Sequence, residues 1–193
     1  MKQLWILAGG NGAGKSTFYD RFLRPHGLSF VNADMIAKTL AEQVSPEVSK
    51  HAQEESMKVC LEKLKNGETF CFETVFSHES KLGLISKAKE LGYSVTLVFI
   101  HLNHSTLNKA RVIQRVNEGG HNVPPDKIES RIPRSLENIH KAIKIVDEVT
   151  LVDNSSGQNP FVRVATVKNN AVTEFVKPLP QWAQNILDPA LPW

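Results

Sequence analysis

A glycine-rich segment near the N-terminus, GGNGAGKST at residues 9–17, constrains this chain more than any other feature. Four of its residues occupy the fixed positions of the pattern G-x-x-x-x-G-K-[ST], namely Gly9, Gly14, Lys15 and Ser16. The pattern requires a buried strand before it and a helix after it, and residues 4–8 (LWILA) and 16–23 (STFYDRFL) meet both requirements. The sequence therefore predicts a strand, a phosphate-binding loop and a helix.

The loop suits phosphate because glycine has no Cβ. Successive backbone N–H groups can then turn inward around an anion, and the following helix directs the positive end of its dipole at the same point. We expect Lys15 to reach the β- and γ-phosphates of ATP and the Ser16 hydroxyl to ligate Mg²⁺. The predicted nucleotide-binding residues are Gly9, Gly10, Asn11, Gly12, Ala13, Gly14, Lys15, Ser16 and Thr17. A glycine-rich turn that binds nothing is disfavoured, since few turns need four glycines beside a lysine.

Composition limits the class of protein. The 193 residues are 41% hydrophobic and 22% charged, which suits one domain over residues 1–193. The net charge of +3 comes from dispersed basic residues, so neither a nucleic-acid-binding arm nor a membrane-binding patch is indicated. The apolar stretch before the glycines is too short for a signal peptide, and Cys60 and Cys71 form no C-x-x-C pair. We expect a cytoplasmic protein with two buried thiols.

Strand-like and helix-like segments alternate along the chain, which is typical of an α/β fold with helices on both faces of a parallel sheet. The expected strands are residues 4–8, 29–32, 70–76, 94–100 and 148–153, and the expected helices include 45–66, 82–92 and 105–117. Two further apolar segments, 161–167 and 172–176, flank Asn169-Asn170 and predict a C-terminal hairpin, followed by a tail that docks on the body through Trp182 and Trp193.

The segment GGHNVPP at residues 119–125 interrupts this alternation. Two glycines and two prolines between charged helical segments are typical of a hinged loop. Helices resume near residues 126–128 and over 135–146. The sequence therefore predicts a mobile helical lid at about residues 117–135.

Residues after the other strands separate the classes of nucleotide-binding protein. Transport ATPases need a signature like L-S-G-G-Q and GTPases need N-K-x-D, and the chain has neither. It has Asp34 after the second strand and Glu73 at the end of the third, where ligands collect in parallel sheets. A phosphate loop, a carboxylate to orient an acceptor hydroxyl and cations near a lid are the components of a small phosphotransferase.

Each candidate also has a plain structural interpretation. Asp34 either caps the next helix or accepts the proton of an acceptor hydroxyl, and the motif context favours the second. Glu73 either forms a salt bridge at the rim or binds acceptor hydroxyls or, through water, Mg²⁺. Surface arginines are usually solvated, but a transition state with charge on three oxygens needs cations. We expect at least two of four lid arginines to be functional, from the set Arg111, Arg115, Arg131 and Arg134.

Several segments resemble the zeta-toxin-like P-loop kinase family. They are the phosphate loop, Val31-Asn32-Ala33-Asp34, Phe72-Glu73-Thr74, the lid segments GGHNVP (119–124) and RIPRSLEN (131–138), and Leu151-Val152-Asp153-Asn154. The resemblance covers roughly three quarters of the chain. It implies a three-layer α/β/α fold of the nucleoside-kinase type, with a parallel five-stranded sheet, a helical lid and a C-terminal β-hairpin.

The resemblance also implies an activity: phosphorylation of a sugar hydroxyl of UDP-N-acetylglucosamine with ATP and Mg²⁺, in a toxin that a small antitoxin protein controls. Lys15 would bind phosphates, Ser16 the metal, and Asp34 would act as base. The arginines assigned to catalysis are Arg115, Arg131 and Arg134, and the residues assigned to the acceptor are Asp34, Glu73, Thr74 and His121. His121 stands where the family's toxins carry an arginine before the lid proline, so the acceptor does not transfer with the fold.

Two alternatives stay open on sequence grounds. The acceptor could be another small molecule, such as an antibiotic or metabolite, or a nucleic-acid end, although an end kinase is expected to carry a more basic groove. The protein could instead be a nucleotide-dependent, partner-binding ATPase with no acceptor. These readings differ in whether consumption of ATP needs a second small molecule.

Overall fold

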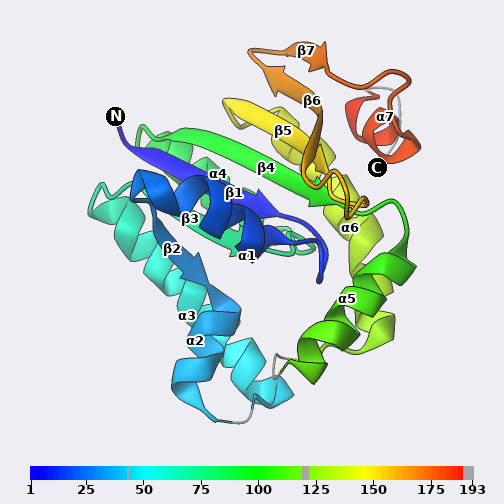
Figure 1. Cartoon of the computed structure of the whole chain (residues 1–193). Helices are drawn as coiled ribbons and strands as arrows, with labels where there is room; N and C mark the ends of the chain where they lie inside the picture. Colours follow the sequence, from blue (N-terminus) through cyan, green and yellow to red (C-terminus); the bar gives the residue numbers. More distant parts are fainter. Residues whose placement is uncertain (43, 119–121, 189–193) are drawn as a thin grey trace.

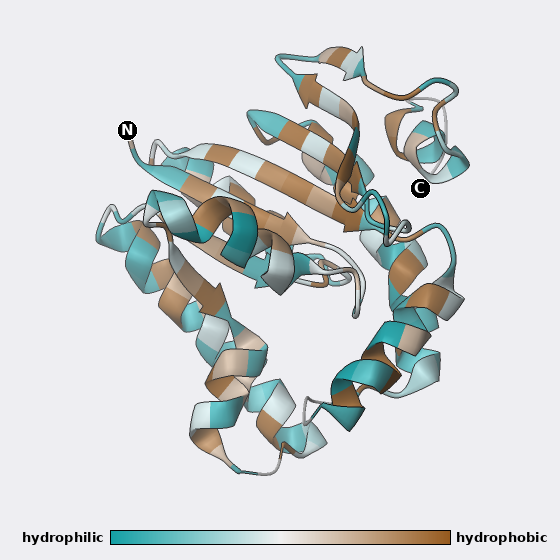
Figure 2. Ribbon diagram, in the orientation of Figure 1, coloured by the Kyte–Doolittle hydropathy of each residue, from teal (hydrophilic) through white to brown (hydrophobic). Residues whose placement is uncertain are grey.

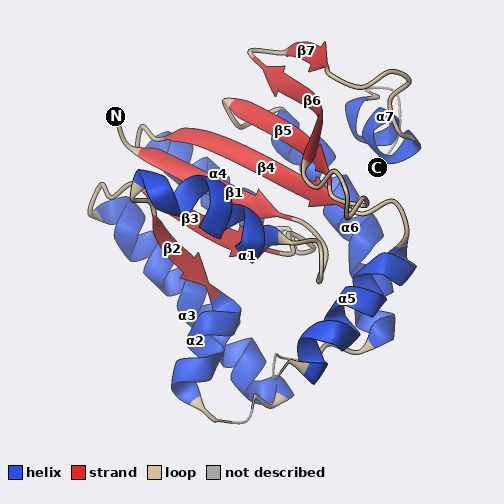
Figure 3. Cartoon of the chain, viewed as in Figure 1, coloured by secondary structure: helices blue, strands red, loops and turns tan. Residues whose placement is uncertain are grey.

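The computed structural model describes residues 1–42, 44–118 and 122–188, which form an α/β fold around one seven-stranded sheet (Figures 1 and 3). The strand order is β2-β3-β1-β4-β5-β6-β7. The strands are β1 Gln3–Ala8, β2 Ser29–Asn32, β3 Phe70–Thr74, β4 Ser94–His101, β5 Glu148–Asp153, β6 Val162–Lys168 and β7 Ala171–Glu174.

The first five strands in this order are parallel, as predicted. The predicted hairpin is also present, but it is not separate from the sheet: β6 pairs antiparallel with β5, and β7 pairs antiparallel with β6. The expected five-stranded sheet is therefore a mixed sheet of seven strands. The physical reason is the outer edge of β5, whose backbone N–H and C=O groups β6 satisfies.

Helices cover both faces of the sheet. They are α1 Lys15–Phe18, the π-helical turn η1 Tyr19–Leu23, the 3₁₀ turn η2 Arg24–His26, α2 Ala33–Leu40, α3 Pro46–Lys65, α4 Ser80–Glu90, α5 Ser105–Asn117, α6 Pro125–Ile143 and α7 Gln181–Leu187. α3, α4, α6 and α7 contribute to the larger apolar core, and η1 and α5 contribute to the smaller one on the opposite face. The three-layer α/β/α arrangement is thus as predicted.

Alternation along the strands separates these two cores. On β1, Leu4 and Ile6 face the larger core and Leu7 faces the smaller one. β4 is buried from Leu97 to His101 and is largely apolar, as Figure 2 shows. A strand covered on both faces loses its polar alternation, which explains why this segment is the most apolar part of the sequence.

α6 differs from the prediction of two shorter helices. It runs without a break from Pro125 to Ile143 and contains Pro133. Proline removes one backbone donor from the helix. The buried Ser135 hydroxyl donates 2.9 Å to the Arg131 carbonyl and lies 2.8 Å from the carbonyl of Val75 in the loop after β3. Tertiary contacts of this kind hold the helix together across the proline.

The lid predicted at about residues 117–135 corresponds to the end of α5 and the first half of α6. Residues 119–121, with His121, lie outside the described residues, as does Trp193. Cys60 and Cys71 are buried and unpaired, as predicted, and burial raises the pKa of Cys60 to about 12. None of the described helices is long and apolar enough to cross a membrane.

The C-terminal tail docks through α7, as expected. Trp182 is buried, its Nε1 donates 3.0 Å to Asn103 Oδ1, and its ring lies 4.7 Å from the ring of His101 at the end of β4. Burial lowers the pKa of His101 from 6.5 to about 4, and the charge of Asp153 opposes this shift. His101 is therefore neutral in the folded protein at pH values where it is protonated in the unfolded chain.

This burial predicts acid sensitivity. Between a pH of about 6.5 and about 4, His101 is protonated in the unfolded state and neutral in the folded state. The free energy of unfolding therefore decreases as the pH falls through this range, by about 3 kcal/mol in all. His101→Phe keeps an aromatic ring against Trp182 and removes the titration. Urea unfolding at a series of pH values should show a shallower acid loss for the variant. Parallel pH profiles for both proteins would contradict the assignment.

Candidate functional site

The loop between β1 and α1 has the conformation that a phosphate-binding loop needs. Gly9 has φ +150°, and a Cβ there would clash with the Ile100 carbonyl oxygen of β4. Gly14 caps α1 with φ +94°, a conformation that side chains with a Cβ rarely adopt. The Phe18 N–H donates 2.9 Å to the Gly14 carbonyl and starts the helix. The helix N-terminus therefore opens directly onto the loop.

Lys15, Ser16 and Glu73 lie together beneath this loop. The Lys15 side chain is only 7% exposed, and its Nζ lies 3.1 Å from the Gly10 carbonyl and 3.7 Å from Glu73 Oε1. Ser16 Oγ donates 2.8 Å to Glu73 Oε2. Glu73 reaches them because β3 lies directly beside β1, with Glu73 in register with Leu7. Glu73, selected from the sequence because it ends a strand, thus lies at the phosphate loop.

This donor set fits Mg²⁺, which prefers hard oxygen ligands. A hydroxyl and a carboxylate lie within hydrogen-bond distance of each other, and a nucleotide would add phosphate oxygens. In the described part of the chain, no three His, Cys, Asp or Glu side chains form a cluster that could hold a metal alone. The metal would therefore bind with the nucleotide, through the phosphates and Ser16.

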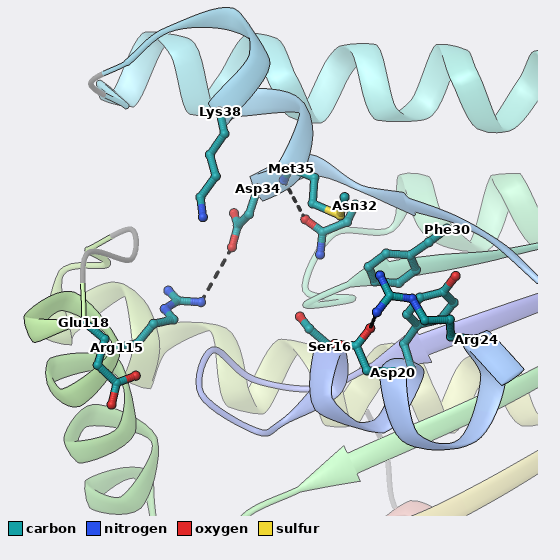
Figure 4. A pocket seen from close by; sticks show the side chains of 11 residues that line it. Ser16, Asp20, Arg24, Phe30, Asn32, Asp34, Met35, Lys38, Arg115 and Glu118 are labelled. Carbon is teal, nitrogen blue, oxygen red and sulfur yellow. Dashed lines mark hydrogen bonds and ion pairs between the residues drawn. The ribbon is translucent and has the colours of Figure 1, made fainter.

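A cavity of about 600 Å³ lies beside the phosphate loop (Figure 4). Its lining residues are Ser16, Tyr19, Asp20, Arg24, Phe30, Asn32, Asp34, Met35, Lys38, Arg115 and Glu118. α1, η1, β2, α2 and α5 supply most of them, so the cavity joins the phosphate loop to α2 and to the helix that precedes the predicted lid. One open space thus contains both a loop serine and the predicted base.

Asp34 faces this cavity and does not cap α2. The cap is Asn32, whose Oδ1 accepts a 2.9 Å hydrogen bond from the Met35 N–H. Asp34 lies in the first turn with its side chain half exposed, and its Oδ2 is 3.7 Å from Arg115 Nη1 across the cavity. The capping alternative for Asp34 is therefore wrong, and its carboxylate is available to a ligand.

Of the four lid arginines, Arg115 lines the cavity and Arg131 contacts the phosphate loop. Arg131 Nη1 donates 3.2 Å to the Asn11 side-chain Oδ1. Burial lowers the pKa of Arg131, the charge of Arg134 lowers it further, and the charge of Asp34 raises it. The guanidinium stays charged at neutral pH because an arginine pKa starts so high. Two of the four arginines therefore lie at the site, and their functional role stays a prediction.

The other two arginines have different positions. Arg111 Nη2 donates 2.8 Å to the Asn154 carbonyl and so connects α5 to the loop after β5. Arg134 is exposed, and its Nε donates to the Ser130 carbonyl within α6. Arg134, predicted to be catalytic together with Arg131, does not line the cavity, because its side chain is exposed and is bonded within α6 to the Ser130 carbonyl.

Two predicted acceptor residues are not part of the cavity wall. Thr74 Oγ1 accepts a 3.1 Å hydrogen bond from the Phe76 N–H and stabilises the turn after β3. Glu73 contacts the phosphate loop, as described above, and does not line the cavity. His121 lies outside the described residues. Of the three predicted acceptor residues that the structure describes, Asp34 is the one that lines the cavity.

Several residues of the cavity wall were not predicted from the sequence. The rings of Tyr19 and Phe30 stack with their centroids 3.9 Å apart, and Arg24, which pairs with Asp20 at 3.1 Å, lines the cavity with them. Lys38 adds a positive charge on the side of Asp34 (Figure 4). Lys38 follows Asp34 by four residues, a spacing that places both on one face of α2 and could have identified it. In the sequence, Tyr19 and Phe30 are indistinguishable from ordinary core residues, because no local pattern indicates that their rings are in contact.

Sequence reasoning also missed two buried asparagines that contact the phosphate loop. Asn108 Nδ2 donates 2.7 Å to the Asn11 carbonyl, and Asn154 Nδ2 donates 2.8 Å to the Ala13 carbonyl. Asn154 directly follows β5, so the argument that selected Asp34 and Glu73 at strand ends could have selected it as well. Asn108 lies within α5 and carries no such signal.

The chain matches the model of the AAA domain family over residues 4–137. It is 28% identical over 141 residues to an uncharacterized protein of Haemophilus influenzae, covering 67% of this chain and 97% of that protein. Two groups of solved structures share its fold. The AvrRxo1-ORF1:AvrRxo1-ORF2 structure with sulphate ions superposes over 100% of this chain, with a TM-score of 0.73 and 20% identity.

The second is a structure of the PezAT toxin-antitoxin system of Streptococcus pneumoniae, with a TM-score of 0.64, 17% identity and coverage of 83% of this chain and 70% of that one. This chain spans 65% of the AvrRxo1 chain. The resemblance inferred from the phosphate loop and the lid segments is thus confirmed. The chain belongs to the AAA domain family, and its fold is that of the zeta-toxin-like P-loop kinases.

Proposed function

We propose that this protein is a Mg²⁺- and ATP-dependent phosphotransferase that transfers the γ-phosphoryl group to a hydroxyl of a small acceptor. The observation that carries the proposal is the shared cavity: Ser16 from the phosphate loop and Asp34 from α2 line the same 600 Å³ space. A donor phosphate on the loop and an acceptor hydroxyl on Asp34 would therefore meet within the same cavity.

The phosphate side binds and neutralises the donor. The loop N–H groups and the dipole of α1 would hold the β-phosphate, and Lys15 would contact the β- and γ-phosphates. Ser16, with Glu73 beside it, would hold Mg²⁺, which when bound offsets the charge of the phosphate oxygens. Lys15 must exchange its contacts with Gly10 and Glu73 for phosphate oxygens, and it is already buried at the right place.

The acceptor side orients the hydroxyl. A carboxylate is a weak base, so Asp34 would accept a hydrogen bond from the hydroxyl, hold it in line and take its proton late. As the acceptor O–H bond breaks, its oxygen bonds to the γ-phosphorus, and the bond to the bridging oxygen of ADP breaks. Arg115 and Arg131 would stabilise the charge on the transferred group, because they lie on the lid side of the loop and cavity.

UDP-N-acetylglucosamine is the first candidate acceptor. The family resemblance suggests it, and the cavity supports an anionic acceptor with a flat group, because its lining contains the stacked rings of Tyr19 and Phe30 and the cations Arg24 and Lys38. A cytoplasmic location would give access to this nucleotide sugar. The antitoxin partner that the resemblance implies stays a prediction. It is supported by two structural neighbours, the structure of AvrRxo1-ORF1 with AvrRxo1-ORF2 and that of the PezAT toxin-antitoxin system.

The first prediction is the reaction itself. With ATP, Mg²⁺ and UDP-N-acetylglucosamine, the protein should produce ADP and a nucleotide sugar that has gained one phosphate, as measured by mass spectrometry. Unchanged nucleotide sugar with retained ATP binding would exclude this acceptor, and a metabolite extract would then be screened. ATP consumption that needs no second small molecule would contradict the kinase assignment and favour a partner-binding ATPase.

The second prediction concerns Asp34. Asp34→Asn should lower kcat about 10²- to 10⁴-fold and leave ATP affinity unchanged, because the amide fills the same space and accepts no proton. Lys15→Ala should instead abolish ATP binding, measured by calorimetry. Asp126→Asn, the same change at an exposed position of α6 outside the cavity, is the matched control. Full transfer activity in Asp34→Asn would rule out Asp34 as the catalytic base.

The third prediction separates the two roles considered for Glu73. Glu73→Gln should raise the Mg²⁺ concentration for half-maximal transfer by about 10- to 100-fold, because the carboxylate that orients Ser16 loses its charge. Glu79→Gln, at an exposed ion pair with Lys141, should change nothing. An unaltered Mg²⁺ profile with a raised KM for the acceptor would place Glu73 on the acceptor side instead.

A further inference from the structure

Two buried asparagines contact the phosphate loop and have no part in the mechanism above. Asn108 of α5 is 2% exposed and Asn154, after β5, is 4% exposed. Each donates its side-chain N–H to a backbone carbonyl of the loop, Asn108 to that of Asn11 and Asn154 to that of Ala13. They lie 97 and 141 residues away from these partners along the chain, so the contacts are made by the fold and not by local sequence.

These hydrogen bonds fix the direction of the loop N–H groups. In a trans peptide the C=O of one residue and the N–H of the next point in opposite directions. Holding the Asn11 carbonyl outward therefore directs the Gly12 N–H inward, and holding the Ala13 carbonyl does the same for the Gly14 N–H. A loop rich in glycine has little else to prevent its peptides from rotating, which would turn carbonyl oxygens toward an incoming phosphate.

The glycines of the loop provide the space that the two asparagines occupy. A Cβ on Gly14 would lie 2.5 Å from Asn154 Nδ2, and a Cβ on Gly10 would lie 2.9 Å from Asn108 Nδ2. Gly10 is not a fixed position of the phosphate-loop pattern, and its φ is not in the left-handed region. Its backbone would tolerate a side chain, so the amide of Asn108 is the reason for glycine here.

Both asparagines are held rigidly enough to impose an orientation. Asn154 Oδ1 accepts a 3.3 Å hydrogen bond from the Phe161 N–H. The backbone N–H of Asn154 donates to the His101 carbonyl, and its backbone carbonyl accepts a hydrogen bond from Arg111. Asn108 projects from the first turn of α5, where the helical backbone fixes its position. The conformational entropy of these two side chains is thus lost during folding and not during ligand binding.

We infer that Asn108 and Asn154 are positioning residues that hold the phosphate loop in its anion-binding conformation before the nucleotide arrives. The inference rests on the proposed nucleotide-binding function of the loop. It assigns to α5 a role beyond carrying Arg115: the same helix holds the loop at Asn108 and reaches the acceptor cavity two turns later.

The test compares the binding of ATP and of tripolyphosphate, measured by calorimetry, in Asn108→Leu and Asn154→Leu. Leucine has a similar size and lacks the N–H donor, and it avoids the negative charge that aspartate would place beside the phosphates. Each variant should bind both probes about tenfold more weakly, the effect of one lost hydrogen bond on the loop conformation. Equal losses for the two probes are expected because the loop contacts only phosphate.

Asn138→Leu is the matched control. Asn138 is also buried, at 3% exposure, and its Nδ2 donates 2.9 Å to a backbone carbonyl, but that carbonyl belongs to Phe76 in the loop after β3. It should lose thermal stability like the other two variants and keep its affinity for both probes. If either leucine variant fails to fold, serine at the same position shortens the side chain out of reach of the carbonyl and stays polar.

Two results would overturn the inference: folded Asn108 and Asn154 variants that bind both probes as the wild type does, or an equal loss of affinity in Asn138→Leu. A further readout tests the contact with Gly10. Gly10→Ala should weaken binding in the wild type and weaken it less in Asn108→Ala, where the space is free; additive losses would contradict the contact. Failure of the proposed transfer reaction would leave these binding results unaffected.

Discussion

The close approach of Gly9 to β4 is the constraint on which the site depends. Because Gly9 has φ +150° and no Cβ, the chain can leave β1 in direct contact with the Ile100 carbonyl and stay close to the carboxyl ends of the strands. A side chain at this position would lift the loop away from the strands. The N-terminus of α1, and with it Lys15 and Ser16, would then lose its place beside the ends of β3 and β5.

The order of the strands in the sheet determines which other residues reach the phosphate loop. With β1 between β3 and β4, and β5 beyond β4, the end of β3 delivers Glu73 to Ser16, and the residue after β5 delivers Asn154 to the loop. α5, which follows β4, carries Asn108 and Arg115 to opposite ends of the site. The carboxyl ends of the parallel strands therefore bring Glu73 and Asn154 to the phosphate loop, and α2, which follows β2, brings Asp34 to the cavity.

What the sequence could and could not predict follows from the range of the interactions. The phosphate loop, the parallel order and the position of Asp34 rest on local patterns and on the rule that strand ends meet, and these predictions agree with the structure. The continuity of α6 could not be read, because Pro133 favours a break locally and Ser135 reaches Val75, 60 residues away. Nor could Arg131 be separated from Arg134, since the packing of α6 decides which one faces the loop.

The two sides of the site differ in rigidity. The Lys15–Glu73 pair is buried, at 7% and 10% exposure, with Lys15 also bonded to the Gly10 carbonyl and Glu73 to the Ser16 hydroxyl, so breaking it without replacing the contacts is costly. The Arg115–Asp34 pair is 37% and 51% exposed at 3.7 Å, and exposed pairs of this kind contribute less than about 1 kcal/mol. In the proposed reaction, an acceptor hydroxyl would displace Arg115 from Asp34 at little cost, so that Arg115 could contact the transferred phosphoryl group. The phosphate-loop side is thus held by buried contacts in the folded protein, whereas the Arg115–Asp34 contact in the cavity is weak.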